Sequence, residues 1–92
     1  MNFDEMIKAA TEIQKKGKPK TLDGRDEYVE QLSNIADEIT EALEAMAEKA
    51  WELRDTISEA GQTDTLQEFK DEFVDMIREQ AGALVDALKG EK

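Results

Sequence analysis

The feature that most constrains this chain is an apolar repeat that advances in steps of three and four residues. Its members are Tyr28, Leu32, Ile35, Ile39, Leu43, Met46, Ala50, Leu53 and Ile57. Such steps place side chains on one face of an α-helix, and no glycine or proline lies within residues 26–60. The repeat therefore predicts one long helix over residues 26–60, about 50 Å in length, with a coiled-coil-like apolar stripe.

Two further segments have helical spacing of apolar residues, and they complete the predicted fold. A short N-terminal helix is expected over residues 2–16, followed by a basic loop over 17–25 that contains Gly17 and Pro19. Another helix is expected over residues 64–88, and the short connection before it favours an antiparallel hairpin with the long helix. The predicted fold class is all-α, a three-helix architecture in a single small domain over residues 1–92. A dimer is compatible with it, because a chain of this size buries only a small core.

Several residue types are absent, and their absence narrows the chemistry. The chain has no cysteine and no histidine, which are the usual zinc ligands, and histidine is also the usual acid–base residue near neutral pH. Its apolar runs are too short for a transmembrane span, and charged residues interrupt the first 16 residues, unlike a signal peptide. We therefore expect a cytoplasmic, non-enzymatic protein with no cofactor and no metal.

The net charge of −11 at pH 7 is distributed unevenly. Residues 1–25 hold 4 acids and 6 bases, residues 26–60 hold 11 acids and 2 bases, and residues 61–92 hold 8 acids and 4 bases. A surface this negative repels nucleic acids and anionic membranes, so we expect neither as a direct partner. A basic protein surface is the partner that the charge favours.

Most of the acids between residues 26 and 60 lie opposite the apolar stripe on a helical wheel. This acidic ridge consists of Asp26, Glu30, Asp37, Glu41, Glu44, Glu48, Glu52, Asp55 and Glu59. Like charges four residues apart destabilise a helix by a few tenths of a kcal/mol, whereas a lysine or arginine at the same spacing would stabilise it. Trp51 lies about 120° from the centre of the stripe. It is either an exposed interface anchor or a side chain covered by the N-terminal helix or a second subunit.

Two functions follow from these two faces of the long helix. Successive carboxylates lie about 5–6 Å apart along the axis, within a factor of two of the charge repeat of a nucleic acid. The ridge thus predicts an inhibitor or nucleic-acid mimic that docks on a basic, nucleic-acid-binding partner, in the manner of small phage anti-defence proteins. The alternative is a structural or adaptor coiled-coil protein that forms a homodimer or higher oligomer through its apolar stripe. The Lys15–Lys20 cluster is a solvated loop, a binding patch, or a contact for the ridge of another copy.

A third hypothesis rests on two acidic patches, residues 37–42 (DEITEA) and residues 71–76 (DEFVDM). These patches resemble the acidic helix motifs of MazG-like nucleotide pyrophosphohydrolases. The resemblance implies that Glu38, Glu41, Glu72 and Asp75 hold magnesium for attack on a nucleoside triphosphate. In a hairpin that turns near residue 62, the two patches would lie roughly 16–20 Å apart along the axis. Such a site therefore requires a break in the long helix or assembly across subunits.

Overall fold

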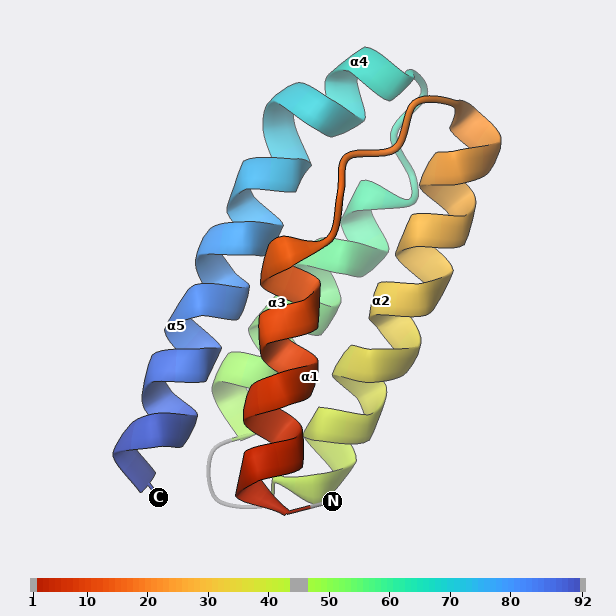
Figure 1. Cartoon of the computed structure of the whole chain (residues 1–92). Helices are drawn as coiled ribbons and strands as arrows, with labels where there is room; N and C mark the ends of the chain where they lie inside the picture. Colours follow the sequence, from red (N-terminus) through yellow and green to blue (C-terminus); the bar gives the residue numbers. More distant parts are fainter. Residues whose placement is uncertain (1, 44–46, 92) are drawn as a thin grey trace.

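A computed structural model of the chain describes residues 2–43 and 47–91, and all regular structure in these ranges is helical (Figure 1). The first three helices are α1 (Phe3–Lys15), α2 (Leu22–Ala42) and α3 (Ala47–Ala60). The last consists of α4 (Leu66–Phe69), the π-helical segment η1 (Lys70–Val74) and α5 (Asp75–Glu91), which follow one another without a gap. The all-α class is confirmed. No helix in the described ranges has both the length and the apolar character that crossing a membrane requires.

The single long helix predicted over residues 26–60 is wrong. Helix α2 ends at Ala42, Leu43 has an extended backbone with φ −104° and ψ 98°, and α3 runs back antiparallel to α2 (Figure 1). Two predicted members of the long helix, Glu44 and Met46, lie outside the described residues. A straight helix would leave much of its apolar stripe without a partner. Folding back lets the two halves of the stripe share one core.

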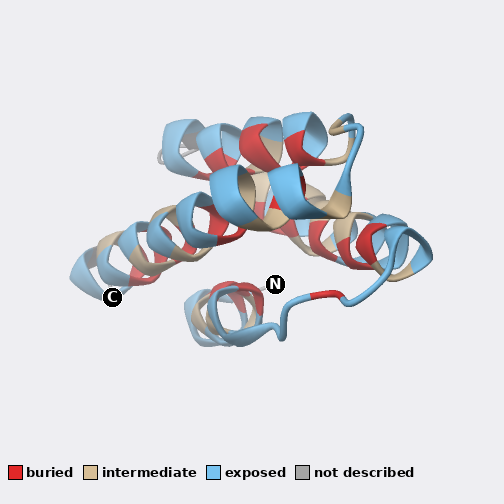
Figure 2. Cartoon of the chain, turned by 90° about the horizontal axis from the view of Figure 1, so that it is seen from above, coloured by how far each residue is buried: buried red, intermediate tan, exposed pale blue. Residues whose placement is uncertain are grey.

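The four helices run alternately up and down, and each directs one apolar face inward (Figures 1 and 2). Helix α1 packs on α2 and α5, and α3 packs on the same two helices, so α1 and α3 lie on opposite sides of the bundle. The largest fully buried side chains are Ile13, Leu32, Ile39, Leu53, Ile57, Phe69, Val74, Ile77, Leu84 and Leu88. Most of the predicted stripe is therefore core, within one chain and without a second copy.

The start of α2 also differs from the prediction, because residues 22–25 are helical rather than part of the basic loop. The Thr21 hydroxyl caps this helix by accepting a hydrogen bond of 2.9 Å from the Gly24 N–H. Arg25 is only 9% exposed. Its guanidinium donates to the Thr63 carbonyl and, at 3.0 Å, to the Thr63 hydroxyl, and it pairs with Asp26 at 2.7 Å. Arg25 therefore ties the beginning of α2 to the turn that follows α3.

The last helix begins at Leu66 rather than residue 64, and its buried face changes at η1. Regular α-helical spacing predicts Phe73 and Met76 in the core. Instead Val74 is buried, Phe73 is partly buried and Met76 is 43% exposed. A π-helical turn contains one residue more than an α-helical turn, so it rotates the following residues relative to the α-helical pattern. The prediction of Met76 as a core residue is therefore wrong.

Candidate protein-interaction surface

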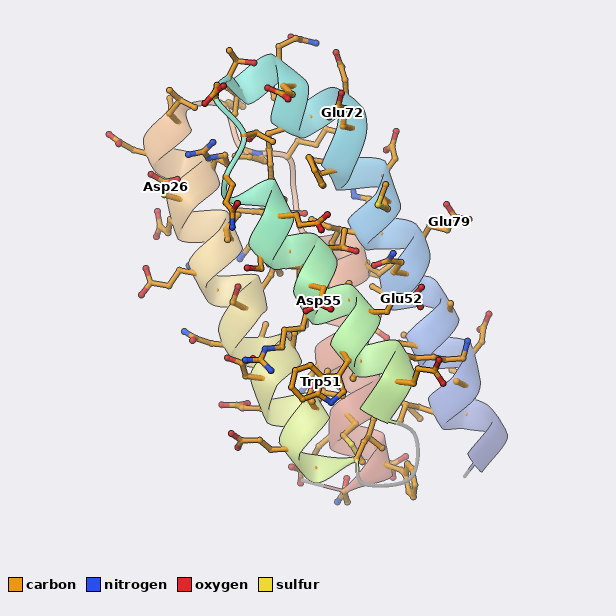
Figure 3. The ribbon with its side chains drawn as sticks, turned by 180° about the vertical axis from the view of Figure 1, so that it is seen from behind. Asp26, Trp51, Glu52, Asp55, Glu72 and Glu79 are labelled. Atoms are coloured by element: carbon orange, nitrogen blue, oxygen red, sulfur yellow. The ribbon has the colours of Figure 1, made fainter. Side chains whose placement is uncertain are left out.

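The predicted acidic ridge is divided between two antiparallel helices. Helix α2 carries Asp26, Glu30, Asp37 and Glu41, whereas α3 carries Glu48, Glu52, Asp55 and Glu59. The ninth predicted member, Glu44, lies outside the described residues. Figure 3 shows Asp26 at one edge of the bundle and Glu52 and Asp55 on the outer side of α3. The break between the helices thus replaces one straight line of charge with two shorter rows.

On α3, every member of the ridge remains free. Its four members, Glu48, Glu52, Asp55 and Glu59, are all exposed. They span about 16 Å along the helix axis. None of the four forms an ion pair with another described residue. Because neighbouring carboxylates repel one another at this spacing, the row presents negative charge that the fold itself does not compensate.

The row on α2 is partly engaged in holding the fold together. Asp26 pairs with Arg25, and the half-buried Asp37 lies 2.6 Å from the Nε of Arg54 on α3. Glu30 and Glu41 are exposed and have no such partner among the described residues. Two of the predicted partner-binding acids therefore have structural partners. Among the described ridge acids, Glu30 and Glu41 on α2 and all four on α3 remain available to another molecule.

Trp51 lies on the outer side of α3, next to the acidic row (Figure 3), and is 47% exposed. Helix α1 does not cover it, since α1 lies on the other side of the bundle. The Arg54 guanidinium lies over the indole ring, 4.6 Å from the ring centroid. Together with Asp37, Thr40 and Glu41, these two residues line a hollow of about 350 Å³ between α2 and α3.

The sequence did not reveal the pairing of Arg54 with Asp37. Asp37 lies five residues before the end of α2, Arg54 lies seven residues after the start of α3, and the two carry opposite charges. Such a pair would indicate a contact across a hairpin, but only if the position of the turn were known. The long-helix prediction instead placed the two side chains more than 20 Å apart along one axis.

The four acids of the hydrolase hypothesis do not come together. Glu38 and Glu41 belong to α2, whereas Glu72 lies in η1 and Asp75 begins α5. Figure 3 shows Glu72 on the last helix, on the far side of α3 from α2. No group of three or more acids in residues 2–43 and 47–91 is close enough to share a metal ion. Although the long helix is broken, the break does not assemble this site within one chain.

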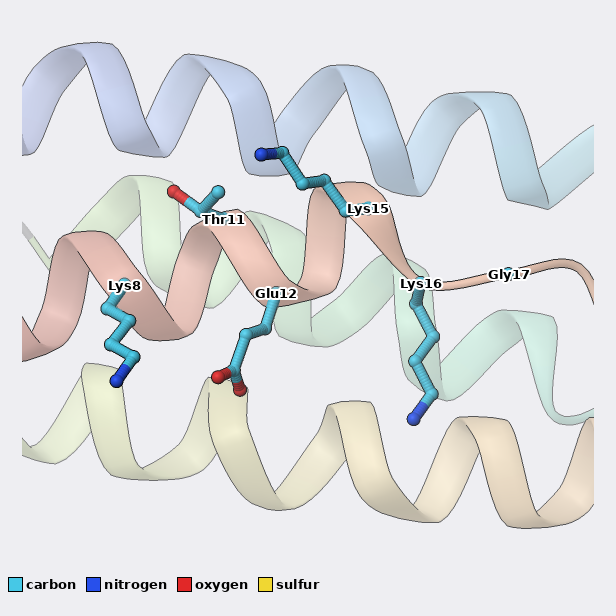
Figure 4. Close-up of a pocket in the computed structure, with 6 residues that line it drawn as sticks. All are labelled: Lys8, Thr11, Glu12, Lys15, Lys16 and Gly17. Atoms are coloured by element: carbon cyan, nitrogen blue, oxygen red, sulfur yellow. The ribbon is translucent and has the colours of Figure 1, made fainter.

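The basic residues near the end of α1 form a different kind of surface. Lys8, Thr11, Glu12, Lys15, Lys16 and Gly17 line an open hollow of about 680 Å³ (Figure 4). Lys15 extends toward α5, whereas Lys8 and Lys16 extend toward α2 on the same side as Glu12. The ammonium groups therefore diverge and do not converge on a common ligand.

Tyr28, on α2, lies close to the basic residues at the end of α1. Its ring packs edge-on against Phe69, with the ring centroids 5.6 Å apart. Its hydroxyl group is buried and has no hydrogen-bond partner among the described residues. Burial raises the pKa of Tyr28 above its usual value of 10.0, and the positive charge of Arg78 partly opposes that rise.

Comparisons of the chain with protein-family models, curated proteins and solved structures found no match. A function must therefore be argued from the surface of the molecule. The outer side of α3, with Glu41 beside it, combines a row of acids with Trp51, the most exposed aromatic side chain among the described residues.

Proposed function

We propose that this chain is a non-enzymatic interaction protein that docks the outer side of α3, and the adjoining end of α2, on a basic partner. The partner would be a nucleic-acid-binding protein, and docking would block its nucleic-acid site. The observation that carries the proposal is the exposed, unpaired row Glu48, Glu52, Asp55 and Glu59, with Trp51 beside it.

The charge of the α3 row and the size of this side of the molecule both support the proposal. A row of uncompensated carboxylates steers a basic partner into contact and supplies charge pairs at the rim of an interface. An exposed tryptophan supplies the apolar anchor that such an interface needs near its centre. The molecule is 38 Å long and 19 Å wide. One side of it is thus comparable to the roughly 800 Å² that a standard interface buries on each partner.

The adaptor alternative has less support, because it acts through the apolar stripe. Within the described residues, Leu32, Ile39, Leu53 and Ile57 are fully buried inside one chain. A second copy would have to displace this core in order to reach them. Homo-oligomer formation stays a prediction, and it would require a surface other than the stripe.

A matched pair of charge-reversal variants tests the proposal. The first variant carries Glu48→Lys, Glu52→Lys and Asp55→Lys on α3, and the control carries Glu72→Lys, Glu79→Lys and Asp86→Lys on the last helix. Both sets of acids are exposed, and both variants change the net charge by the same amount. Helicity is compared by circular dichroism, and basic proteins are captured from host lysate and then titrated individually.

We expect the α3 variant to lose at least about tenfold in affinity for a nucleic-acid-binding protein, and the control variant to lose much less. The affinity of the unmodified chain should also fall as salt is raised, because the interface relies on exposed charge. The proposal is wrong if both variants bind alike, or if the captured partner does not bind nucleic acid.

A further inference from the structure

We infer that the hollow beside Trp51 receives an arginine side chain of the basic partner, held between the indole ring and the Glu41 carboxylate. This inference rests on the function proposed above and specifies the residue by which the partner is anchored. The hollow has a volume of about 350 Å³ and is lined by Asp37, Thr40, Glu41, Trp51 and Arg54.

The chain already binds one guanidinium group at this place. The guanidinium of Arg54 lies over the Trp51 ring at 4.6 Å, and its Nε lies 2.6 Å from the Asp37 carboxylate. Stacking on an aromatic ring combined with contact to a carboxylate is the geometry in which arginine is favoured over lysine. A flat indole ring has two faces, and with Trp51 47% exposed, part of its surface remains available to a second cation.

The charges around the hollow select a cation as the incoming group. Asp37 and Arg54 neutralise each other, so the remaining charged residue of the lining is Glu41. Glu41 is exposed and forms no ion pair with another described residue. Thr40 donates its hydroxyl proton to the Ala36 carbonyl at 2.7 Å, which leaves the lone pairs of its oxygen as acceptors.

The position of the hollow agrees with its use as an anchor. It lies between α2 and α3, and Figure 3 shows Glu52 and Asp55 of the acidic row close to Trp51 on α3. A side chain seated there would be surrounded by carboxylates that hold neighbouring basic residues of the same partner. Such an arrangement, with one desolvated aromatic contact inside a charged rim, is typical of binding hot spots.

The chain contains a single tryptophan, so its fluorescence reports on this hollow directly. The probe is a short acetylated peptide with three arginines separated by glycines, and the comparison is the same peptide with lysines. We expect the arginine peptide to change the Trp51 emission and to bind roughly three- to fivefold more tightly than the lysine peptide. Binding of a labelled peptide is also followed by fluorescence anisotropy, so that variants without tryptophan can be measured.

Two variants of the hollow and one control complete the test. Glu41→Gln and Trp51→Leu should each weaken binding of the arginine peptide about fivefold, whereas Glu72→Gln, with the same charge change as Glu41→Gln, should have much less effect. The inference is overturned if arginine and lysine peptides bind equally, if neither variant of the hollow weakens binding, or if the arginine peptide does not bind at all. If the peptide depends on Glu48, Glu52 and Asp55 but not on Glu41 or Trp51, the arginine site is wrong while the proposed acidic docking surface stands.

Discussion

Helices α1 and α3 lie on opposite sides of the bundle, and their inner faces are alike while their outer faces differ. Both pack on α2 and α5, and both bury apolar side chains: Met6, Ala10 and Ile13 on α1, and Ala50, Leu53, Ile57 and Ala60 on α3. Outside, the end of α1 and the segment after it carry Lys15, Lys16, Lys18 and Lys20, whereas α3 carries an uninterrupted row of acids.

The difference between the outer faces shows which parts of the two helices folding constrains and which it does not. Core packing constrains the inner faces of both helices, and any soluble exterior would satisfy the outer faces. On α1 the lysines diverge and Glu12 lies among them, as is ordinary for a solvated surface. On α3 the acids are aligned next to an exposed tryptophan, at spacings that oppose helix formation. Folding does not require that alignment, and the proposed docking surface rests on it.

If the inner faces of α1 and α3 are alike, both helices contribute similarly to the core, and one side-chain truncation on each helix tests this. Ile13→Ala and Leu53→Ala each remove a fully buried side chain, so each should lower the free energy of unfolding by about 2–5 kcal/mol. Urea denaturation measures both values. Ser58→Ala, at an exposed position on α3, serves as the control and should remain within about 0.5 kcal/mol. A loss below about 1 kcal/mol for Leu53→Ala would mean that α3 is not packed on the core.

The hairpin that positions α3 can be fixed covalently. A Cβ placed on Gly61 would lie 3.9 Å from the Cβ of Val29, within the range for a disulfide, and the chain has no other cysteine. The double variant Val29→Cys, Gly61→Cys should therefore form an intramolecular bridge. Closing a loop of about 30 residues should stabilise the oxidised form by roughly 3.5–4 kcal/mol over the reduced form.

The measurement for this variant is urea denaturation with and without a reducing agent, together with non-reducing electrophoresis. In a straight helix over residues 26–60, positions 29 and 61 would be almost 50 Å apart, and only intermolecular bridges could form. A ladder of disulfide-linked oligomers would therefore support the straight helix and contradict the α2–α3 hairpin.

The stability contribution of Tyr28, on α2, should depend on alkaline pH. Burial raises its pKa in the folded protein, so below pH 10 both states keep the proton and its contribution to stability is unchanged. As the pH rises above 10, the unfolded state loses the proton before the folded state does, and stability falls. The chain has one tyrosine, so absorbance at 295 nm should show a titration midpoint above 10.0.

Tyr28→Phe is the control for that titration, because lysines also lose protons in this pH range. The variant should lack the part of the alkaline stability loss that Tyr28 causes. At neutral pH it should change stability by less than about 1 kcal/mol, since the hydroxyl has no hydrogen-bond partner among the described residues. A midpoint at or below 10.0 would show that the hydroxyl is solvated.

The smallest effects are expected on the basic side of the molecule. Lys15→Gln with Lys16→Gln should change the free energy of unfolding by no more than a few tenths of a kcal/mol, because both side chains are exposed. Affinity for a basic partner should change less than about twofold, or rise slightly at low salt. Urea denaturation and titration of the captured partner measure these effects. A large loss of affinity would assign the docking surface to α1 rather than α3.

The sequence by itself determined the features that depend on local spacing of side chains: the positions of helices and the faces that they bury or expose. The helical spacing of apolar residues identified α1 to within one residue at each end, and it identified most of the core positions on α2 and α3. The same spacing placed Glu48, Glu52, Asp55 and Glu59 on the outer side, since a residue opposite a buried stripe faces water. It left open whether Trp51 is exposed or covered.

Only the tertiary structure decided where the chain turns and what the acids lie beside. The apolar steps continue from Ile39 through Leu43 to Ala50, with no glycine or proline, so nothing local indicates that α2 ends at Ala42. The turn exists because the two halves of the stripe bury more apolar surface against each other and against α5 than a straight helix could. The position of the turn therefore depends on the packing of the whole chain and not on local sequence. It also brought Asp37 to Arg54, formed the hollow at Trp51, and turned a predicted line of charge into two rows on one surface.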